Sequence, residues 1–552
     1  MQLHSLRGAA IGASLLCAGL FPCAAAFERA AWYFGDDGPG NFWESFQPGR
    51  VDSDLFRIKG DGFNAIFLAV PWDLFDPGLN GRMPERQRRD LALVVAAAGR
   101  LHLGVYVRAG YYWDYDDRAF QPRDERFFPA LYDPGCREHL KQFLTTLDGV
   151  CRSAGGVSGT ILSWEDFWRF MGTAGDSEER RLQLARESGF QAFLQGRYSL
   201  EAVERDFARK FGSFSEVPLP SSDGPAYAYL LEFFDHGFSQ ILDIGRSAIP
   251  GLSAEVRVDF DPVRAPDGRI TWFDHSKTYR LAGASHDRLF TYWAPFMWEQ
   301  NRGETVDATE AIHSFDVTQD RLMAVARGSC LFVDQFNFVD NSPGMEQNAR
   351  LAAGEVPNFI ARVAPVLYRE AVGYGIWTYQ DYTWNKVIDS NFSVAGRDWV
   401  GEGWRIVSCS GQTFAHLSQG GALRQAFNRL QLMNKDPELP HVLNFWAQTV
   451  GGMGTVEISL SPDLETGQKW SPIRLELNNP GGRWCRIDFP ANEGNPSALG
   501  FRAIAGEIEI THIRYYSHIQ SNGFYDTYGS PGVNLSLLRD LNATLARFGT
   551  GR

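Results

Sequence analysis

The sequence contains few cysteines and no motif typical of nucleotide or metal binding. Seven cysteines occur among 552 residues, and none forms a CxxC motif or a Cys/His cluster with metal-ligand spacing. Neither a disulfide scaffold nor a structural metal site is therefore expected. No Walker motif occurs and no GxGxxG follows the first predicted strand, so we expect no cofactor of the nucleotide type and predict none of any other.

A surplus of basic charge is also missing. Acidic side chains outnumber basic ones by 66 to 53, which gives a formal net charge of −13. No run of lysine and arginine stands out against this balance. Nucleic acids and anionic membranes are bound largely through basic patches, so the composition argues against both as main partners.

Residues 1–26 are typical of a secretory signal peptide. Arg7 supplies the early positive charge, Ala9 to Phe21 form an apolar run too short to span a membrane, and Ala24–Ala26 offer small residues for cleavage. No later segment has 18 consecutive apolar residues. We therefore expect a secreted or periplasmic protein with no membrane association after cleavage; an uncleaved anchor is the alternative.

Five cysteines follow this segment. Cys409 and Cys485 fall in the same predicted domain, where they can form a disulfide. Cys136 and Cys151 flank one predicted helix, whose length would hold their sulfur atoms too far apart.

Aromatic residues, by contrast, are abundant. They make up 14% of the chain and include 16 tryptophans. A chain of 552 residues exceeds what one hydrophobic core usually holds, so two or more domains are expected. An acidic, aromatic-rich protein suits ligands with apolar faces, and sugars are the obvious candidates.

Residues 27–385 alternate between short β-branched or aromatic runs and segments of helical periodicity. Eight such runs predict a (β/α)8 barrel, with an open doubly wound sheet as the alternative. The predicted strands are Ala31–Phe34, Asn64–Val70, Gly104–Ala109, Gly159–Trp164, Ala254–Phe260, Leu289–Ala294, Cys330–Phe336 and Gly373–Tyr379. The predicted helices include Asp90–Ala98, Glu138–Cys151 and Asn358–Ala371, and a mostly helical excursion covers Ser177–Pro250.

In residues 386–518 the sequence pattern changes to short alternating strands separated by Gly, Asn and Pro turns. This pattern predicts an antiparallel β-sandwich. Trp399, Trp404 and Trp446 belong either to a ligand platform or to its core. The tail, residues 519–552, ends in a predicted amphipathic helix over Leu535–Phe548. The predicted strands of the sandwich are Trp404–Ser408, Thr413–Leu417, Thr455–Leu460, Arg474–Leu477, Trp484–Phe489 and Glu507–Tyr516.

In a (β/α)8 barrel the active site lies at the C-terminal ends of the strands. Nearly every predicted strand end here combines aromatic side chains with carboxylates or carboxamides. This mixture suits sugars, whose C–H faces stack on rings while their hydroxyls bind acids and amides. The predicted substrate-binding residues are Trp72, Arg108, Tyr111, Trp164, Asp166, His275, Tyr292, Trp293, Asn337, Trp377 and Tyr379.

Cleavage of a glycosidic bond needs two carboxyl groups, a proton donor and a nucleophile or base. Glu165, at the end of strand four, is the predicted acid/base. Asp334 and Gln335 end strand seven, and in a regular strand only one of them faces the barrel axis. Asp261, Glu299 and Asp381 are lesser candidates for the second carboxyl.

These residues resemble those of the clan A glycoside hydrolases, the (β/α)8 group that includes cellulases, mannanases and β-galactosidases. The resemblance covers residues 30–385 and rests on the order of several short motifs. They are DLFRIKGDGFNAIFLAVPWDLFDP, GVYVRAGYY, FQAFLQGRYSLEAVERDFARKFGSFSEVPLP, LFVDQFNF and GYGIWTYQDY. The resemblance implies a glycosidase and a carbohydrate-binding-like second domain, whose opening SNFSVAGRDWVGEGW and segment LRQAFN look like parts of such a sandwich.

Two positions depart from the pattern of that clan. Trp164 stands at the usual Asn place before the acid/base, and Gln335 stands at the usual nucleophilic Glu. A carboxamide is a poor nucleophile, so Asp334 or another carboxylate takes the role, the mechanism is inverting or substrate-assisted, or the barrel binds without cutting. We therefore expect an exported glycosidase acting on a polysaccharide or oligosaccharide; the alternatives are a non-catalytic polysaccharide-binding protein and a barrel lyase or transglycosylase.

Overall fold

The fold is taken from a computed structural model of the whole chain. The residues that it describes are 26–36, 38–111, 126–222, 224–256, 262–264, 270–272, 288–295, 305–326, 330–337, 350–383, 385–392, 395–396, 398–409, 412–427, 440–462, 469–478, 480–490, 496–517, 519–520 and 523–549.

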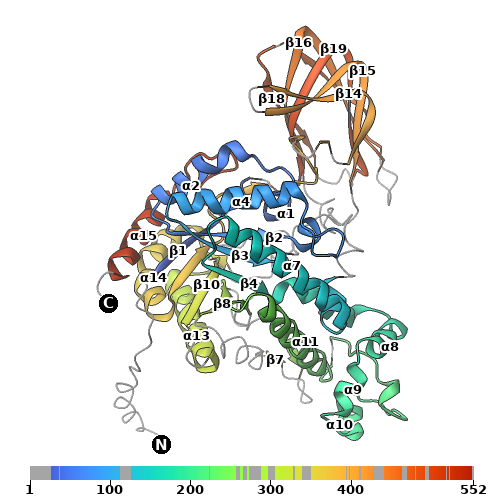
Figure 1. The fold of residues 1–552 in the computed structure, drawn as a ribbon, viewed down its shortest axis with the longest axis vertical. Coiled ribbons are helices and arrows are strands. Elements are labelled where there is room, and N and C mark those ends of the chain that lie inside the picture. Colours follow the sequence, from blue (N-terminus) through green and yellow to red (C-terminus); the bar gives the residue numbers. More distant parts are fainter. Residues whose placement is uncertain are drawn as a thin grey trace, which may run out of the picture.

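Eight parallel strands close into a barrel in the order β1-β12-β10-β8-β5-β4-β3-β2 (Figure 1). This arrangement confirms the predicted (β/α)8 barrel and excludes the open sheet. The strands are β1 (Glu28–Trp32), β2 (Ala65–Val70), β3 (Gly104–Ala109), β4 (Gly159–Ser163), β5 (Ser253–Glu255), β8 (Arg288–Trp293), β10 (Cys330–Phe336) and β12 (Gly373–Ile376). Each matches one predicted strand, and the largest difference is at the fifth, where β5 ends at Glu255.

The barrel interior is filled with aromatic rings. The Phe332 ring of β10 lies 5.2 Å from the Tyr106 ring of β3 and 5.6 Å from the Phe67 ring of β2. These strands are not neighbours in the barrel, so their rings meet across its interior. Phe290 and Trp32 complete the same group, with centroid distances of 5.1 Å to Phe332 and 5.0 Å to Phe67. Parallel barrels are packed cores, and here rings supply the packing.

The N-terminal end of the barrel is closed by a polar group around the Tyr106 hydroxyl. This hydroxyl donates to the Glu28 carboxylate and accepts from Arg288, and the two charged side chains pair with each other. Burial and the neighbouring Glu28 carboxylate raise the pKa of Tyr106. The phenol is therefore neutral.

The helices surround the barrel, and α7, α8 and α10 begin at side-chain caps. In α7 the Asp133 side chain accepts from the Cys136 amide, and Pro134 starts the helix. The helices α8, α9, α10 and α11 form the predicted excursion after β4. The helices are α1 (Gly38–Asn41), α2 (Val51–Gly60), α3 (Trp72–Phe75), α4 (Glu85–Arg100), α6 (Phe127–Ala130), α7 (Pro134–Ser153), α8 (Glu178–Glu187), α9 (Phe190–Gln195), α10 (Leu200–Asp206), α11 (Tyr227–Ala248), α13 (Ala308–Ala326), α14 (Val356–Glu370) and α15 (Leu535–Gly549).

Segments of 3₁₀ helix and two-stranded ribbons connect these elements. The 3₁₀ segments are η1 (Pro48–Arg50), η3 (Trp164–Gly175), η4 (Phe214–Glu216) and η6 (Ala353–Glu355). The ribbons are β6 (Pro262–Arg264) with β7 (Ile270–Trp272), and β9 (Thr305–Val306) with β11 (Arg350–Leu351). No helix among the described residues is long and apolar enough to cross a membrane.

The second domain is an antiparallel sheet of six strands, in the order β14-β15-β19-β16-β17 with β18 beside β16. Its strands are longer than the sequence predicts, since β16 and β19 each continue past glycine bulges that resemble turns. They are β14 (Trp399–Cys409), β15 (Gln412–Ala426), β16 (His441–Leu460), β17 (Ile473–Leu477), β18 (Arg483–Phe489) and β19 (Ala498–Tyr516). Trp399 is buried in the core of this domain. Cys409 and Cys485 do not form the disulfide that the sequence allows.

Two connections join the second domain to the barrel. The outgoing chain, β13 (Tyr382–Thr383), pairs with the returning chain, β20 (Ile519–Gln520). A polar seam lies beside them, and Figure 1 shows the second domain next to α1 at this point. The seam contacts are Asn41 Nδ2 to the Asn385 carbonyl (2.8 Å), Ser45 Oγ to Ser390 Oγ (2.9 Å), Asn391 Nδ2 to the Ser45 carbonyl (2.9 Å) and Asp36 Oδ2 to Arg514 Nη2 (2.7 Å).

The returning tail packs against the barrel through Asp61, which follows α2. The buried Asp61 carboxylate accepts hydrogen bonds from the Tyr379 hydroxyl (2.6 Å), the Tyr525 hydroxyl (2.8 Å) and Arg539 Nε (2.7 Å). Asn542 of α15 donates to the Asp61 carbonyl at 2.9 Å. One carboxylate therefore ties the tail to the barrel.

Replacement of Asp61 should destabilise the fold. Asp61→Ala leaves two buried phenol hydroxyls and one guanidinium without their acceptor, so we expect a loss of about 3 kcal/mol in the free energy of unfolding. Urea denaturation measures it. The control is Asp52→Ala, on the exposed side of α2 in an ion pair with Arg100, where a change below about 1 kcal/mol is expected. Equal losses in the two variants would contradict the role of Asp61.

Candidate active site

The C-terminal ends of β3 and β4 meet at the guanidinium of Arg108. Arg108 is fully buried and binds Asp166 with two hydrogen bonds, Nε to Oδ2 at 3.0 Å and Nη2 to Oδ1 at 2.7 Å. Nη2 also donates to Glu165 Oε2 at 3.2 Å. Its guanidinium lies over the Tyr111 ring, 4.9 Å from the centroid. The structure therefore brings together four residues predicted from separate strand ends.

A third carboxylate joins this group from β5. Glu255 pairs in register with Ser163, and the Ser163 hydroxyl donates to the Glu255 carboxylate. The same hydroxyl accepts from the Glu165 amide at 3.2 Å, which caps the start of η3. Ser163 therefore fixes the backbone position of Glu165 and the orientation of Glu255 together.

Charge in this group is unbalanced. Burial alone would lower the pKa of Arg108, but Asp166, Glu165 and Glu255 outweigh it and raise that pKa well above its usual value. Among the described residues, one permanent cation thus faces three carboxyl groups.

Solvent reaches the three carboxyl groups unequally. The Glu165 side chain is 17% exposed, whereas Asp166 is completely buried and so is Glu255. Glu165 is therefore the most solvent-accessible carboxyl of this group.

β10 carries a bulge at the predicted second carboxyl. Val333 pairs with Thr291 and Gln335 with Tyr292, so Asp334 is the extra residue. The aromatic rings on either side of Asp334 support the bulge. Phe332 lies in the barrel interior, while Phe336 packs on Phe315 and Phe359 of the outer helices. Residues four apart in a regular strand share a face, and these two do not.

In a regular strand only one of Asp334 and Gln335 would face the barrel axis. The bulge breaks this alternation, so that rule does not hold here. Gln335 lies level with Tyr292, and both Asp334 and Gln335 are buried. The Asp334 carbonyl accepts from Trp32 Nε1 at 2.6 Å, which anchors the bulge to β1. Such bulges are common beside active sites, where they redirect a side chain.

Two further predicted residues lie near these strand ends. Asn337 follows β10, is buried, and its amide donates to the Trp293 carbonyl at 2.9 Å. Trp377 follows β12 and is half-buried, with its ring 5.1 Å from Trp32 and 5.2 Å from Phe34.

Four predicted substrate-binding residues lie in the packing between barrel and helices instead. Trp72 packs on Phe143 of α7, Trp164 on Phe234 of α11, and Trp293 on Phe359 of α14. The Tyr379 hydroxyl binds Asp61 on the tail side. Their positions at strand ends are as predicted, but the side chains turn outward, so we assign them no contact with substrate. His275, Asp261 and Glu299 lie outside the described residues.

Sequence reasoning missed Glu255 and Ser163. Strand five was predicted as Ala254–Phe260, which placed Glu255 near its start and away from its C-terminal end. An acid within the apolar run of a strand buried on both faces was nevertheless a usable signal. Among the described residues, no group of three or more His, Cys, Asp or Glu side chains is arranged to hold a metal ion.

The chain is thus a (β/α)8-barrel protein with a buried arginine–carboxylate group at the C-terminal strand ends. No protein-family model matches it, and no curated protein sequence matches it. Three solved structures show what its fold is similar to. An exo-β-1,4-mannosidase from Opitutaceae bacterium strain TAV5 is 13% identical with a TM-score of 0.40, and the match covers 65% of this chain and 53% of that chain.

GH5_18 from Streptomyces cattleya in complex with GlcNAc is 15% identical over 65% of this chain and 72% of that chain, with a TM-score of 0.41. A β-galactosidase from the psychrophilic Marinomonas ef1 is 15% identical over 64% of this chain and 54% of that chain, with a TM-score of 0.42. The chain spans about half the length of the mannosidase and of the galactosidase. At these values the likeness concerns the barrel fold, and function has to be argued from the residues of this chain.

Loss of the Arg108 guanidinium should destabilise the fold, because buried carboxylates lose the cation that they face. Arg108→Met leaves Asp166 and Glu255 without it, so we expect a loss of about 3–5 kcal/mol in the free energy of unfolding at pH 7. In the variant the folded-state pKa values of these carboxyls rise above their unfolded values. The folded state then binds the extra protons, and the loss shrinks as the pH falls toward 5.

Urea denaturation at pH 7 and pH 5 measures both effects. Arg88→Met is the control, because Arg88 is exposed on α4 and pairs only with Glu85 among the described residues. A loss for Arg108→Met that is the same at both pH values would contradict the proposed charge balance.

Proposed function

We propose that the barrel is a glycoside hydrolase that cleaves O-glycosidic bonds of a polysaccharide or oligosaccharide, with Glu165 as its acid/base. The observation that carries the proposal is the position of Glu165. It is the solvent-reached carboxyl of a group in which one arginine faces three acids, at the end of β4. A carboxyl that can gain and lose a proton at a strand end is what glycoside cleavage needs first.

The neighbouring residues give Glu165 a defined orientation. Arg108 holds one carboxylate oxygen at 3.2 Å, and Ser163 fixes the backbone amide. Asp166 occupies the remaining face of Arg108 with two hydrogen bonds, so the arginine cannot turn away. Arg108 therefore orients Glu165 with one hydrogen bond, while Asp166 remains the main partner of the arginine.

The second carboxyl of the proposed reaction is Asp334. It lies in the β10 bulge beside Gln335, whose carboxamide cannot form a glycosyl-enzyme. Asp334 would act as nucleophile in a retaining reaction, or as base for water in an inverting one. Gln335, level with Tyr292, would bind a sugar hydroxyl through its amide.

Gln335 also favours a second candidate function. A carboxamide in place of a nucleophilic acid is what a barrel that binds polysaccharide without cutting it would carry. Both candidate functions use the aromatic and acidic strand ends, but only the hydrolase would cleave its glycan.

Release of reducing ends separates the two candidates. The wild-type chain is incubated with β-mannan, β-galactan, mixed-linkage β-glucan and carboxymethylcellulose. We expect release from at least one glycan, lowered roughly 10²–10⁴-fold in Glu165→Gln, which keeps an oxygen for Arg108 but cannot transfer a proton. Asp334→Asn should lower release similarly. The control is Glu85→Gln, exposed on α4 and far in sequence from the site.

Each outcome decides between the candidates. Undiminished release by Glu165→Gln would remove Glu165 from its role. No release by the wild-type chain, together with retention of the chain on a glycan gel, would favour the binding protein. Activity that appears only in Gln335→Glu would indicate a barrel that has lost its nucleophile.

We also propose that the chain is exported and acts outside the cytoplasm. The support is the expected cleavage site after Ala26, followed at once by the folded chain: Phe27 is buried, and its carbonyl accepts from Asn64 Nδ2 at 3.2 Å. Mass spectrometry of the protein recovered from the periplasm or medium should give Phe27 as the first residue. An intact amino terminus in the cytoplasmic fraction would contradict export.

A further inference from the structure

No step of the proposed cleavage uses Glu255, although this residue belongs to the candidate active site. Glu255 ends β5, is completely buried, and pairs in register with Ser163 of β4 and with Phe290 of β8. The Phe290 ring lies in the barrel interior, 5.6 Å from the Tyr106 ring. Residues that pair in a sheet point their side chains to the same face, so Glu255 and Ser163 also point toward the barrel axis.

The Ser163 hydroxyl links Glu255 to the main chain of Glu165. It donates its proton to the Glu255 carboxylate and accepts from the Glu165 amide at 3.2 Å, as the N-cap of η3. A hydroxyl has one proton, so its bond to Glu255 turns a lone pair, and not the proton, toward that amide. Without Glu255 to accept the proton, the hydroxyl can rotate and the cap on the Glu165 amide weakens.

Glu255 has a second connection to Glu165, through charge. Burial lowers the pKa of Arg108, but Asp166, Glu165 and Glu255 outweigh it and raise that pKa well above its usual value. Arg108 in turn donates to Glu165 Oε2 at 3.2 Å. The connection through Ser163 depends on the reach of the Glu255 side chain, whereas the connection through Arg108 depends on its charge.

We propose that Glu255 is a positioning residue for the cleavage reaction, which sets the direction of the Ser163 O–H bond and thereby holds Glu165 in place at the end of β4. The proposal rests on the proposed function, because it takes Glu165 as the acid/base. Since Glu255 is completely buried, it acts through Ser163 and not by touching the substrate. A misplacement of about 1 Å at a reacting group can lower a rate roughly 10²-fold, so this support matters to the reaction.

Two substitutions separate the reach of Glu255 from its charge. Glu255→Gln has the same length and keeps an oxygen for the Ser163 hydroxyl, whereas Glu255→Asp keeps the charge but is one methylene group shorter. On a glycan that the wild-type chain cleaves, we expect Glu255→Asp to lower kcat roughly tenfold, with KM changed less than about twofold. Glu255→Gln should keep kcat within about threefold of the wild-type value, because a neutral acceptor still binds the hydroxyl.

The dependence on Ser163 has its own test. Ser163→Ala should lower kcat about as much as Glu255→Asp does. The double variant should lose no more than either single variant, because both substitutions remove the same connection. Additive losses would mean that Glu255 acts by another route and would overturn the proposal.

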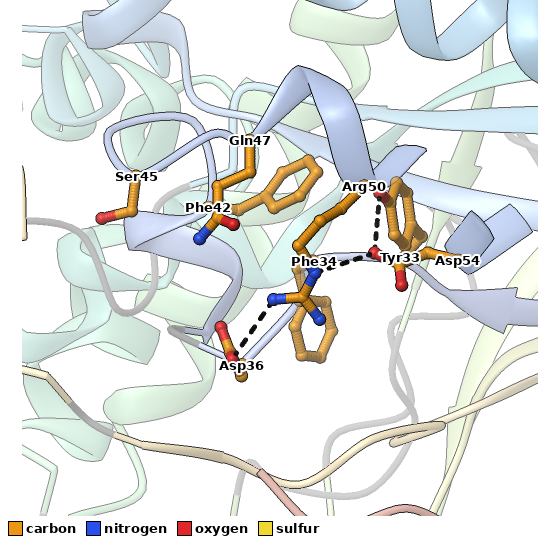
Figure 2. A pocket seen from close by; sticks show the side chains of 9 residues that line it. Tyr33, Phe34, Asp36, Phe42, Ser45, Gln47, Arg50 and Asp54 are labelled. Carbon is orange, nitrogen blue, oxygen red and sulfur yellow. Dashed lines mark hydrogen bonds and ion pairs between the residues drawn. The ribbon is translucent and has the colours of Figure 1, made fainter. Parts of the chain in front are cut away.

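Asp54 provides a matched control outside this group. It is buried on α2, accepts from the Tyr33 hydroxyl at 3.4 Å and has Arg50 beside it, so its partners resemble those of Glu255 (Figure 2). Asp54→Asn removes a buried charge there, and we expect its kcat and KM to equal those of the wild-type chain. If Asp54→Asn loses as much kcat as Glu255→Asp, the effect is not specific to Glu255 and the proposal is overturned.

Hydrogen exchange tests the same connection without turnover. Deuterium uptake by the peptide that contains Glu165 should be faster in Glu255→Asp and Ser163→Ala than in the wild-type chain, and unchanged in Glu255→Gln. If the wild-type chain cleaves no glycan, the hydrolase falls, while this order of uptake still supports Glu255 as the residue that positions Glu165.

The other outcomes leave the hydrolase standing and remove the role of Glu255. If a glycan is cleaved and both Glu255 variants keep the wild-type kcat, the positioning role is overturned. Equal losses in the two variants, or a loss in Glu255→Gln alone, also overturn it, because the loss then does not follow the reach of the side chain. Thermal melting shows which variants are folded, and Ser163→Ala with Glu255→Gln suffices if Glu255→Asp is not.

Discussion

The packing of aromatic rings across the barrel interior is the constraint on which the rest of the structure depends. Rings from β1, β2, β3, β8 and β10 meet there, at centroid distances between 5.0 and 5.6 Å for the contacts that define the layer. Because these rings fill the cross-section, polar side chains are confined to its two ends. Glu28 and Arg288 close one end around Tyr106, and Arg108 with its carboxylates occupies the other.

This separation explains why a charged group can be buried at the candidate site. A guanidinium taken out of water is costly unless its donors are satisfied, and Asp166 and Glu165 accept from three of its N–H bonds. Glu255 adds a further negative charge and is itself held by Ser163. Of these three carboxyl groups, Glu165 is the most exposed to solvent.

Much of the barrel was predictable because its strands are buried on both faces. Runs such as Ala65–Val70 are continuously apolar, and two of the eight predicted strands, Gly104–Ala109 and Cys330–Phe336, have the same bounds in the structure. The Arg108–Glu165–Asp166 group also followed from strand ends, since parallel strands end at one side of the barrel.

The direction of individual side chains was less predictable. A residue at a strand end can face the axis or the helices, and sequence position does not separate Arg108, which faces inward, from Trp293, which packs on α14. The bulge at Asp334 has no local mark in the sequence, because it arises from register with β8 and β12. In the second domain, β16 and β19 were predicted too short because their bulges contain residues typical of turns.

The paired strands β13 and β20 make the second domain an insertion into the barrel rather than an appendage after it. The chain leaves after β12, builds the second domain, and returns to place α15 beside α14, where the Tyr368 hydroxyl donates to the Phe548 carbonyl. A domain held at both of its ends resists rotation far more than one on a single linker. The face that the second domain turns toward the barrel is therefore fixed by two covalent connections and by the ion pair of Asp36 with Arg514.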